Sequence, residues 1–458
     1  MKRVALLAAV VAVSVSGCGG TSAGTSFAPA SVAGPALQDD ASSLHIKHIV
    51  LIVQENRSFD NLFATFPGAD GATSGKKHDG TAQTLKMKAL AGALDINHDW
   101  KTYSAEYNHA KMNGFDLCKI DGSTPCGTYA YQYVNPAQIQ PYWTMAQRYA
   151  LADHMFQTQG SGSFTAHQDL IAGTTAINST QSVIDYPSEW KSWGCDAPKS
   201  PPTTTSVMDY HKDYLQGQGP FPCLAYPTGT LADLLDKKLV TWKYYAPLYK
   251  YDTAGALWNA FAAIDAVRHG PDWGNISTPE TNIFNDISGG TLPALSWVIP
   301  EQPNSDHPNG SRAPDNGPAW AASIVNAVGQ STYWKSTAIF ILWDDWGGFY
   351  DHEVPPPLDK TADGTVYGLG FRVPVIIVSP FVPAGEISHT QYEFGSILKF
   401  IEGTFKLGNM GTTDVRAASI GNVFNFKQRP RSFATIPSDK SKKYFLAQPP
   451  SFLPVDRE

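Results

Sequence analysis

The composition of the chain is that of a globular protein. Its 458 residues are 42% hydrophobic and 16% charged, which is enough apolar surface for a large core and excludes a disordered or collagen-like chain. The 41 acidic residues outnumber the 34 lysines and arginines, for a net charge of −7. This acidic balance argues against electrostatic binding of nucleic acid.

The first 18 residues are typical of an export signal. Two basic residues at positions 2 and 3 precede an apolar run, and small residues with Cys18 follow it. Residues 15–18 (VSGC) resemble a bacterial lipobox, in which the cysteine is lipidated, although an ordinary signal peptide containing a cysteine also fits. The run is too short to span a bilayer. We therefore expect an exported protein: a periplasmic or cell-surface lipoprotein, held at most by an N-terminal lipid anchor, or otherwise a secreted protein.

The folded part is expected to begin near residue 45. Residues 19–44 are rich in small residues and lack apolar periodicity, which is typical of a flexible linker. Five runs of strand length follow: 45–54, 241–246, 295–299, 338–343 and 373–378. Segments with helical spacing occur between and after them, around residues 231–235, 320–328 and 394–401. Alternating strands and helices predict an α/β fold with a mostly parallel central sheet covered on both faces.

Two long stretches, residues 63–131 and 175–227, lack such patterns and are rich in Gly, Pro, Trp and Tyr. We expect them to be loop insertions that shape a cleft. Four tryptophans could line that cleft, although buried packing is the commoner role: Trp100, Trp190, Trp193 and Trp346.

Four cysteines follow Cys18: Cys118, Cys126, Cys195 and Cys223. An exported compartment permits disulfides, and three pairings are possible. Short sequence separation favours Cys118–Cys126 and Cys195–Cys223. The spacings do not match a zinc-binding motif, so structural disulfides are expected.

Polar residues directly follow two predicted strands. Glu55 and Asn56 end the first strand, and Asp344 and Asp345 end a later one, before two glycines. Ligands of open α/β sheets gather at the carboxyl ends of the strands, and oxygen ligands suit Mg²⁺, Ca²⁺ or Mn²⁺. Neighbouring residues of a strand point to opposite faces, so each pair reaches one centre only if the chain turns there. Taken alone, such pairs are more often turns.

Histidines and a serine add to these candidates. His98, His307 and His352 each have an adjacent acidic residue that could orient the imidazole. A Gly/Ser loop at residues 160–164 offers Ser161 and Ser163 as possible nucleophiles. A metal that lowered the pKa of the hydroxyl would remove the need for a histidine base.

Residues 55–63 (ENRSFDNLF) resemble the E-N-R-S-F-D-x-x-F segment of the bacterial phosphoesterase family, which contains phospholipases C and certain acid phosphatases. Further motifs match in family order at residues 98–100, 152–154, 241–245, 306–308, 343–348 and 351–356. The resemblance implies an alkaline-phosphatase-like, three-layer α/β/α sandwich. It also implies hydrolysis of phosphoric esters through a covalent phospho-enzyme.

The resemblance also implies roles for particular residues. Four would hold one divalent metal ion, with Ca²⁺ or Mg²⁺ favoured: Glu55, Asn56, Asp344 and Asp345. Three histidines would contact the phosphoryl group or protonate the leaving oxygen: His98, His307 and His352. Ser163 would be the nucleophile, selected over Ser161 by its distance from Gly173. The phosphoesterase catalytic domain is predicted to span residues 45–410, with a C-terminal extension at residues 411–458 packed on it.

The substrate class stays open between a phospholipid and a soluble phosphate ester. Phospholipase members have Gly-Pro-Asn-Arg after the nucleophile, whereas this chain has Phe-Thr-Ala-His at residues 164–167. The rival hypothesis is a surface lipoprotein that binds a metal or a phosphorylated ligand without turnover. The sequence leaves the oligomeric state undetermined.

Overall fold

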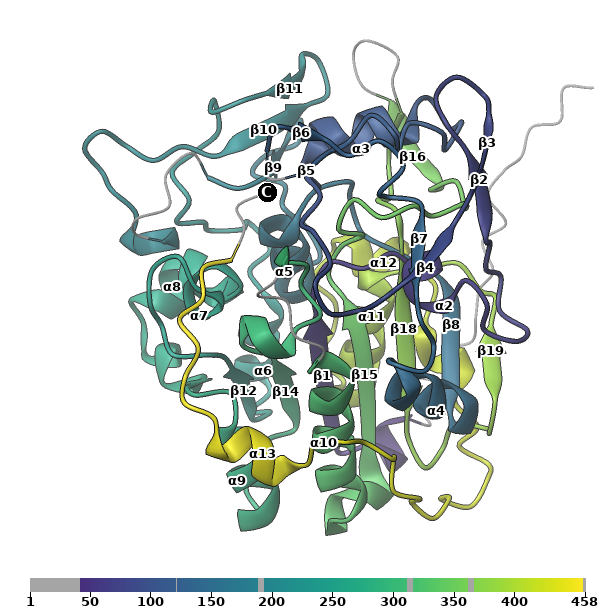
Figure 1. Cartoon of the computed structure of the whole chain (residues 1–458). Helices are drawn as coiled ribbons and strands as arrows, with labels where there is room; N and C mark the ends of the chain where they lie inside the picture. Colours follow the sequence, from purple (N-terminus) through teal and green to yellow (C-terminus); the bar gives the residue numbers. More distant parts are fainter. Residues whose placement is uncertain (1–41, 121, 188–192, 311–315, 361–365, 456–458) are drawn as a thin grey trace, which may run out of the picture. The chain divides into compact units, whose positions relative to one another are not determined.

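The computed structural model describes residues 42–120, 122–187, 193–310, 316–360 and 366–455 (Figure 1). These residues belong to one unit, residues 34–458. The predicted signal with Cys18, nearly all of the predicted linker, and Trp190 lie outside the described residues.

The described residues form a nine-stranded central sheet. Its order is β13 (Ile276–Ser277), β12 (Trp242–Tyr245), β14 (Leu295–Val298), β1 (His48–Gln54), β15 (Thr337–Trp343), β18 (Arg372–Val378), β8 (Ala150–Phe156) and β19 (Glu386–Ser388), with β20 (Tyr392–Glu393) also paired to β8. The strands run parallel except β18, which is antiparallel to both of its neighbours. The predicted mostly parallel sheet is thereby confirmed.

Helices cover both faces of this sheet. Phe340 and Trp343 of β15 point to opposite faces because they lie an odd number of residues apart. Phe340 meets Phe400 of α11 (Phe394–Phe405) at 5.6 Å between ring centroids, whereas Trp343 meets Tyr142 of α4 (Gln140–Arg148) at 4.9 Å. Figure 1 shows α4 and α10 (Gly317–Gly329) in front of the sheet and α11 behind it. The fold is therefore the predicted three-layer α/β/α sandwich.

The five predicted strands are β1, β12, β14, β15 and β18, and the three predicted helices are α6 (Leu231–Lys237), α10 and α11. The sequence prediction missed β8, whose apolar run is interrupted by Asp153 and His154. The remaining helices are α2 (Phe59–Phe63), α3 (Trp100–Tyr107), α5 (Ser163–Ala172), α7 (Ala254–Leu257), α8 (Asp265–Arg268), α9 (Asn282–Gly289), α12 (Thr413–Arg416) and α13 (Lys442–Ala447).

The long insertions contain short strands. These are β2 (Ser74–Lys76), β3 (Ala82–Thr84), β4 (Lys86–Lys88), β5 (Lys119–Ile120), β6 (Thr124–Pro125), β7 (Gln132–Val134), β9 (Gln181–Ile184), β10 (Ser206–Asp209) and β11 (Asp213–Leu215). A further pair, β16 (Pro357–Lys360) and β17 (Val366–Gly368), follows β15. Trp100, Trp193 and Trp346 are buried and pack against other aromatic rings. They are core residues, which was the commoner of the two expected roles.

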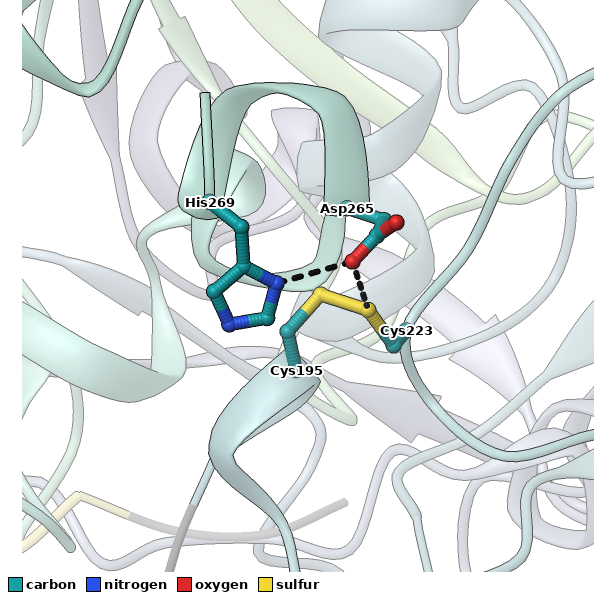
Figure 2. A group of neighbouring side chains, drawn as sticks. All are labelled: Cys195, Cys223, Asp265 and His269. Atoms are coloured by element: carbon teal, nitrogen blue, oxygen red, sulfur yellow. Dashed lines mark hydrogen bonds and ion pairs between the residues drawn. A yellow bond between two sulfur atoms is a disulfide. The ribbon is translucent and has the colours of Figure 1, made fainter. Parts of the chain in front are cut away.

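Both favoured disulfides, Cys118–Cys126 and Cys195–Cys223, are present. Figure 2 shows that the second lies beside Asp265, which contacts Cys223 Sγ at 3.4 Å and His269 Nδ1 at 2.8 Å. Zinc binds cysteine as the thiolate. The disulfide therefore leaves this group unsuited to zinc.

The segment after Met410 packs on the same hydrophobic core as the sheet. Its buried members include Ile420, Phe424, Ile436 and Phe445, and the Phe424 ring stacks on Phe400 at 4.8 Å. None of the described helices is long and apolar enough to cross a membrane.

Candidate active site

The ends of β1 and β15 bring two acidic motifs together. The strands are parallel neighbours with Gln54 opposite Trp343, so Glu55-Asn56 and Asp344-Asp345 emerge side by side. Asn56 has a left-handed backbone (φ 61°), and its N–H donates to Asp344 Oδ1 at 3.0 Å. This turn resolves the problem that successive strand residues point to opposite faces.

Gly347, which follows β15, lies against the backbone of Asn56, which follows β1. Its φ is 61°, and a Cβ atom there would lie 2.3 Å from the carbonyl oxygen of Asn56. The Gly347 N–H donates to Asp345 Oδ1 at 2.7 Å. A residue without a side chain is therefore needed for the backbone to approach Asn56 and orient the Asp345 carboxylate.

The Asn56 side chain is the centre of a buried polar cluster. Its Nδ2 donates to both oxygens of Asp345 at 3.1 Å and lies 2.7 Å from His98 Nε2. The same nitrogen lies 3.4 Å from the Ser163 hydroxyl oxygen. Residues separated by more than 280 positions in the chain thus meet at one amide.

Ser163 is the first residue of α5, which follows β8. Its hydroxyl donates to Asp345 Oδ2 at 3.0 Å. Ser161, the alternative serine, instead donates to Asp185 Oδ1 at 3.2 Å and accepts from the Asp185 N–H at 2.9 Å. Of the two hydroxyls, the Ser163 hydroxyl therefore joins the carboxylate cluster, while that of Ser161 is used to hold residue 185.

Two of the predicted histidines lie near each other at this cluster, with their ring centroids 6.5 Å apart. His98 Nδ1 donates to the carbonyl of Ile96 at 2.7 Å, which directs Nε2 toward Asn56. His307 Nδ1 donates to the carbonyl of Pro308 at 2.6 Å, and its ring stacks on Trp258 at 5.5 Å. Backbone carbonyls therefore supply the orienting contact to each Nδ1.

The acidic neighbours of these histidines have other structural roles. Asp99 caps α3 by accepting from the Thr102 N–H at 2.9 Å. Asp306 Oδ2 accepts from the Tyr142 hydroxyl at 2.7 Å, and the Asp306 carbonyl accepts from Arg57. The expectation that the adjacent acid orients the imidazole is therefore wrong for His98 and His307, because the neighbouring side chain is engaged elsewhere.

His352 lies in a different polar group. Its Nδ1 bonds to Asp60 Oδ2 at 2.7 Å and lies 3.3 Å from the guanidinium of Arg372. Its Nε2 faces Asp70 and Glu353, each at 3.4 Å. The structure thus brings Ser163, His98 and His307 to the Asn56 cluster and gives His352 other neighbours.

His167 belongs to the cluster and was not among the predicted site residues. It lies one helical turn after Ser163, and its Nε2 donates to Glu55 Oε1 at 2.9 Å and lies 3.6 Å from Asp344 Oδ2. Burial lowers the pKa of His167 to about 4. The i, i+4 spacing from Ser163 on one helix face was the available signal.

The residues at the strand ends carry the kinds of oxygen atoms that bind divalent cations, and Glu55 and Asp344 belong to a group of potential metal ligands that also includes His167. Glu55, Asn56, Asp344 and Asp345 are fully buried, and Asn56 Oδ1 and Asp344 Oδ2 accept no hydrogen bond. Buried polar atoms are normally satisfied, and carboxylate and amide oxygens are the ligands of Mg²⁺, Ca²⁺ and Mn²⁺. A half-turn of the Asn56 amide would exchange Oδ1 for Nδ2, so this side chain can coordinate a cation or donate in its absence.

The sequence profile of the phosphoesterase family matches residues 46–408. The chain therefore belongs to the phosphoesterase family, which confirms the resemblance inferred from residues 55–63 and the later motifs.

Two named phospholipases C and a solved structure are similar to this chain. It is 25% identical to the non-hemolytic phospholipase C of Pseudomonas aeruginosa, over 89% of this chain and 62% of that protein. It is 24% identical to phospholipase C B of Mycobacterium tuberculosis, over 84% of this chain and 78% of that protein. A solved structure of a protein in the alkaline phosphatase superfamily from Vibrio parahaemolyticus covers 86% of this chain and 78% of its own, at 12% identity and TM-score 0.33. The chain thus spans less than two thirds of the length of the P. aeruginosa protein.

Proposed function

We propose that the chain is an exported, metal-dependent hydrolase of phosphoric esters that acts through a phosphoserine at Ser163. The observation that carries this proposal is the contact of the Ser163 hydroxyl with Asp345 Oδ2 at 3.0 Å, inside a buried cluster of oxygen ligands. Membership in the phosphoesterase family and the relatives named phospholipase C support the reaction class.

Glu55, Asn56, Asp344 and Asp345 are the proposed ligands of one divalent cation, with Ca²⁺ or Mg²⁺ favoured. When bound, such a cation lowers the pKa of a neighbouring hydroxyl and neutralises charge on the phosphoryl oxygens. The Ser163 hydroxyl donates to Asp345 Oδ2, and this contact is proposed to orient Oγ for attack on phosphorus.

In the first step the Ser163 hydroxyl gives up its proton, the bond from Oγ to phosphorus forms, the bond from phosphorus to the leaving oxygen breaks, and the leaving oxygen takes up a proton. In the second step a water oxygen bonds to phosphorus, the bond from phosphorus to Oγ breaks, and Oγ takes up a proton to restore the hydroxyl. Because Ser163 begins α5, the N–H groups of the first turn lack intrahelical acceptors and can bind phosphoryl oxygens.

His98 and His307 are the proposed proton donors to the leaving oxygen or hydrogen-bond donors to the phosphoryl group. The bonds from Nδ1 to the carbonyls of Ile96 and Pro308 fix the tautomer of each ring. Each Nε2 is then the nitrogen that gains or loses a proton. The contacts of His352 do not support the same role, and its predicted catalytic part stays a prediction.

The substrate is proposed to be a phosphate ester, either a phospholipid or a soluble ester. Phosphate or phosphocholine release by purified protein should be measured on p-nitrophenyl phosphate and on phosphatidylcholine, with Mg²⁺ or Ca²⁺ supplied. Ser163→Ala is expected to abolish release from whichever substrate is used, whereas Ser161→Ala is expected to retain it. No release by the wild-type protein from either ester would favour the rival hypothesis of a binding protein without turnover.

A further inference from the structure

A second group of potential metal ligands lies near β8 and β18, separate from the residues that contact Asn56. The group consists of Asp70, His154, His352 and Glu353. Asp70 Oδ2 lies 3.2 Å from His154 Nε2, and Asp70 Oδ1 lies 3.4 Å from His352 Nε2. Glu353 Oε1 lies 3.4 Å from the same His352 nitrogen. Asp70 therefore lies between the two imidazoles, with one oxygen facing each ring.

The spacing of these atoms is close to that of a zinc site. Ligands about 2.0–2.1 Å from zinc form a tetrahedron with edges of about 3.3 Å. The separations of 3.2, 3.4 and 3.4 Å are near this edge, with the two histidines on different oxygens of Asp70. One ligand atom each from Asp70, His154 and Glu353 lies within 4.8 Å of the others. His352, which contacts Asp70 and Glu353, would have to move toward this group to become the fourth ligand.

A buried carboxylate lies behind each histidine, and that of Asp60 is hydrogen-bonded to His352. His352 Nδ1 bonds to Asp60 Oδ2 at 2.7 Å, and His154 Nδ1 lies 3.1 Å from Asp153 Oδ1. Asp60 and Asp153 are fully buried. A carboxylate on the far nitrogen of the ring is the usual partner of a metal-binding histidine, because it fixes the ring and raises its basicity.

A β-bulge places His154 in this position. Val373 pairs with Met155 and Val375 with Ala152, so Asp153 and His154 together oppose Pro374 alone. Proline has no N–H for the ladder and is tolerated in a strand at such bulges. A bulge also redirects side chains, which accounts for the close approach of the neighbouring Asp153 and His154 side chains.

The buried guanidinium of Arg372 connects the three segments that carry the ligands. Its Nη1 donates to the carbonyls of Asp70 and Asp153 at 2.8 and 2.9 Å. Its Nε donates to Asp351, the residue before His352, at 3.1 Å. The ligand side chains themselves are 21–42% exposed, so an ion can enter from solvent. The backbone is thus fixed while the ligand atoms remain accessible.

We propose that Asp70, His154, His352 and Glu353 bind one Zn²⁺-type transition-metal ion, which ties the loop at residue 70 to β8 and to the segment after β15. The two nitrogen ligands select this class of ion, whereas the oxygen ligands at the ends of β1 and β15 suit Mg²⁺ or Ca²⁺. The proposal is independent of the phosphoesterase reaction.

The test is zinc uptake by the metal-free full-length protein in excess Ca²⁺, measured by elemental analysis and by X-ray absorption at the zinc edge. The wild-type protein is expected to bind one zinc ion with two imidazole ligands. His154→Ala is expected to weaken this binding by roughly 100-fold or more. The control is His78→Ala, which removes an exposed histidine whose Nδ1 also meets an aspartate, at 2.6 Å, and it should bind zinc like the wild-type protein.

Asp70→Asn combined with Glu353→Gln changes only partly exposed side chains and serves if His154→Ala does not fold. Loss of the imidazole-ligated zinc from this variant would support the proposal. Equal zinc uptake by wild-type and variant proteins, an absorption spectrum without imidazole ligands, or no uptake by the wild-type protein would overturn it.

Discussion

Replacing Gly347 by alanine perturbs the contact that holds the ends of β1 and β15 together. The new Cβ would lie 2.3 Å from the Asn56 carbonyl oxygen, whereas real Cβ atoms essentially never approach closer than 3.0 Å. The backbone at Asn56 or Gly347 must therefore move by at least about 0.7 Å. Displacing a catalytic group by about 1 Å can lower the reaction rate about 100-fold. Because Asn56 contacts Asp345, Ser163 and His98, this shift would disturb the whole cluster.

Two effects are expected from Gly347→Ala. The left-handed φ costs a non-glycine residue about 1–2 kcal/mol, and relief of the contact should bring the total loss of unfolding free energy to about 2–4 kcal/mol. The shift at Asn56 should lower kcat/KM for phosphate release by roughly 30- to 100-fold. Urea unfolding followed by tryptophan fluorescence and a steady-state assay measure the two effects.

Gly127→Ala is the matched control. Gly127 has a similar φ of 56°, and a Cβ there would meet no atom within 4 Å. This variant should show the conformational cost of about 1–2 kcal/mol and nearly normal activity. If Gly347→Ala lost no more stability than Gly127→Ala and kept wild-type kcat/KM, the close approach of Gly347 to Asn56 would not be needed for the active site.

Other predictions address the chemistry and the stability. His98→Gln is expected to lower kcat by roughly 100-fold or more, and EDTA should abolish phosphate release until Mg²⁺ or Ca²⁺ is restored; unchanged turnover in either experiment contradicts the proposed roles. Burial raises the pKa of Asp169 to about 8, so the folded protein retains a proton that the unfolded chain releases near pH 4, and stability falls as pH rises between these values. Asp169→Asn should therefore raise the melting temperature more at pH 8 than at pH 5. Serine replacement of both cysteines should cost about 3.6 kcal/mol for Cys195–Cys223 and about 2.5 kcal/mol for Cys118–Cys126, from their separations of 28 and 8 residues. Equal losses of unfolding free energy in urea would contradict this dependence on loop length.

The central strands could be predicted because their signals are local. Strands such as β15 are buried along their whole length, and a run of apolar residues in the sequence records that burial directly. The same logic placed Glu55 and Asp344 at strand ends. The sequence prediction missed β8, because Asp153 and His154 interrupt its apolar run. These two residues form a bulge opposite Pro374 of β18, and this pairing cannot be recognised from the sequence of β8 alone.

The long-range partners in the polar clusters could not be predicted. His352 is oriented by Asp60, 292 positions away, and not only by residues next to it in the chain. His98 and His307 are oriented by backbone carbonyls. Every residue has a carbonyl, so the residue types in the sequence do not indicate these contacts. His167 was accessible in principle through its spacing from Ser163, but its contact with Glu55 depends on how α5 packs beside β1.

Mass spectrometry of protein quenched with acid during turnover of a phosphate ester tests the phosphoserine directly. A phosphoryl adduct is expected on the peptide that contains Ser163, assigned to that side chain and absent from Ser163→Ala. Phosphate release with the adduct on Ser161 or on a histidine, or continued release by Ser163→Ala, would contradict it.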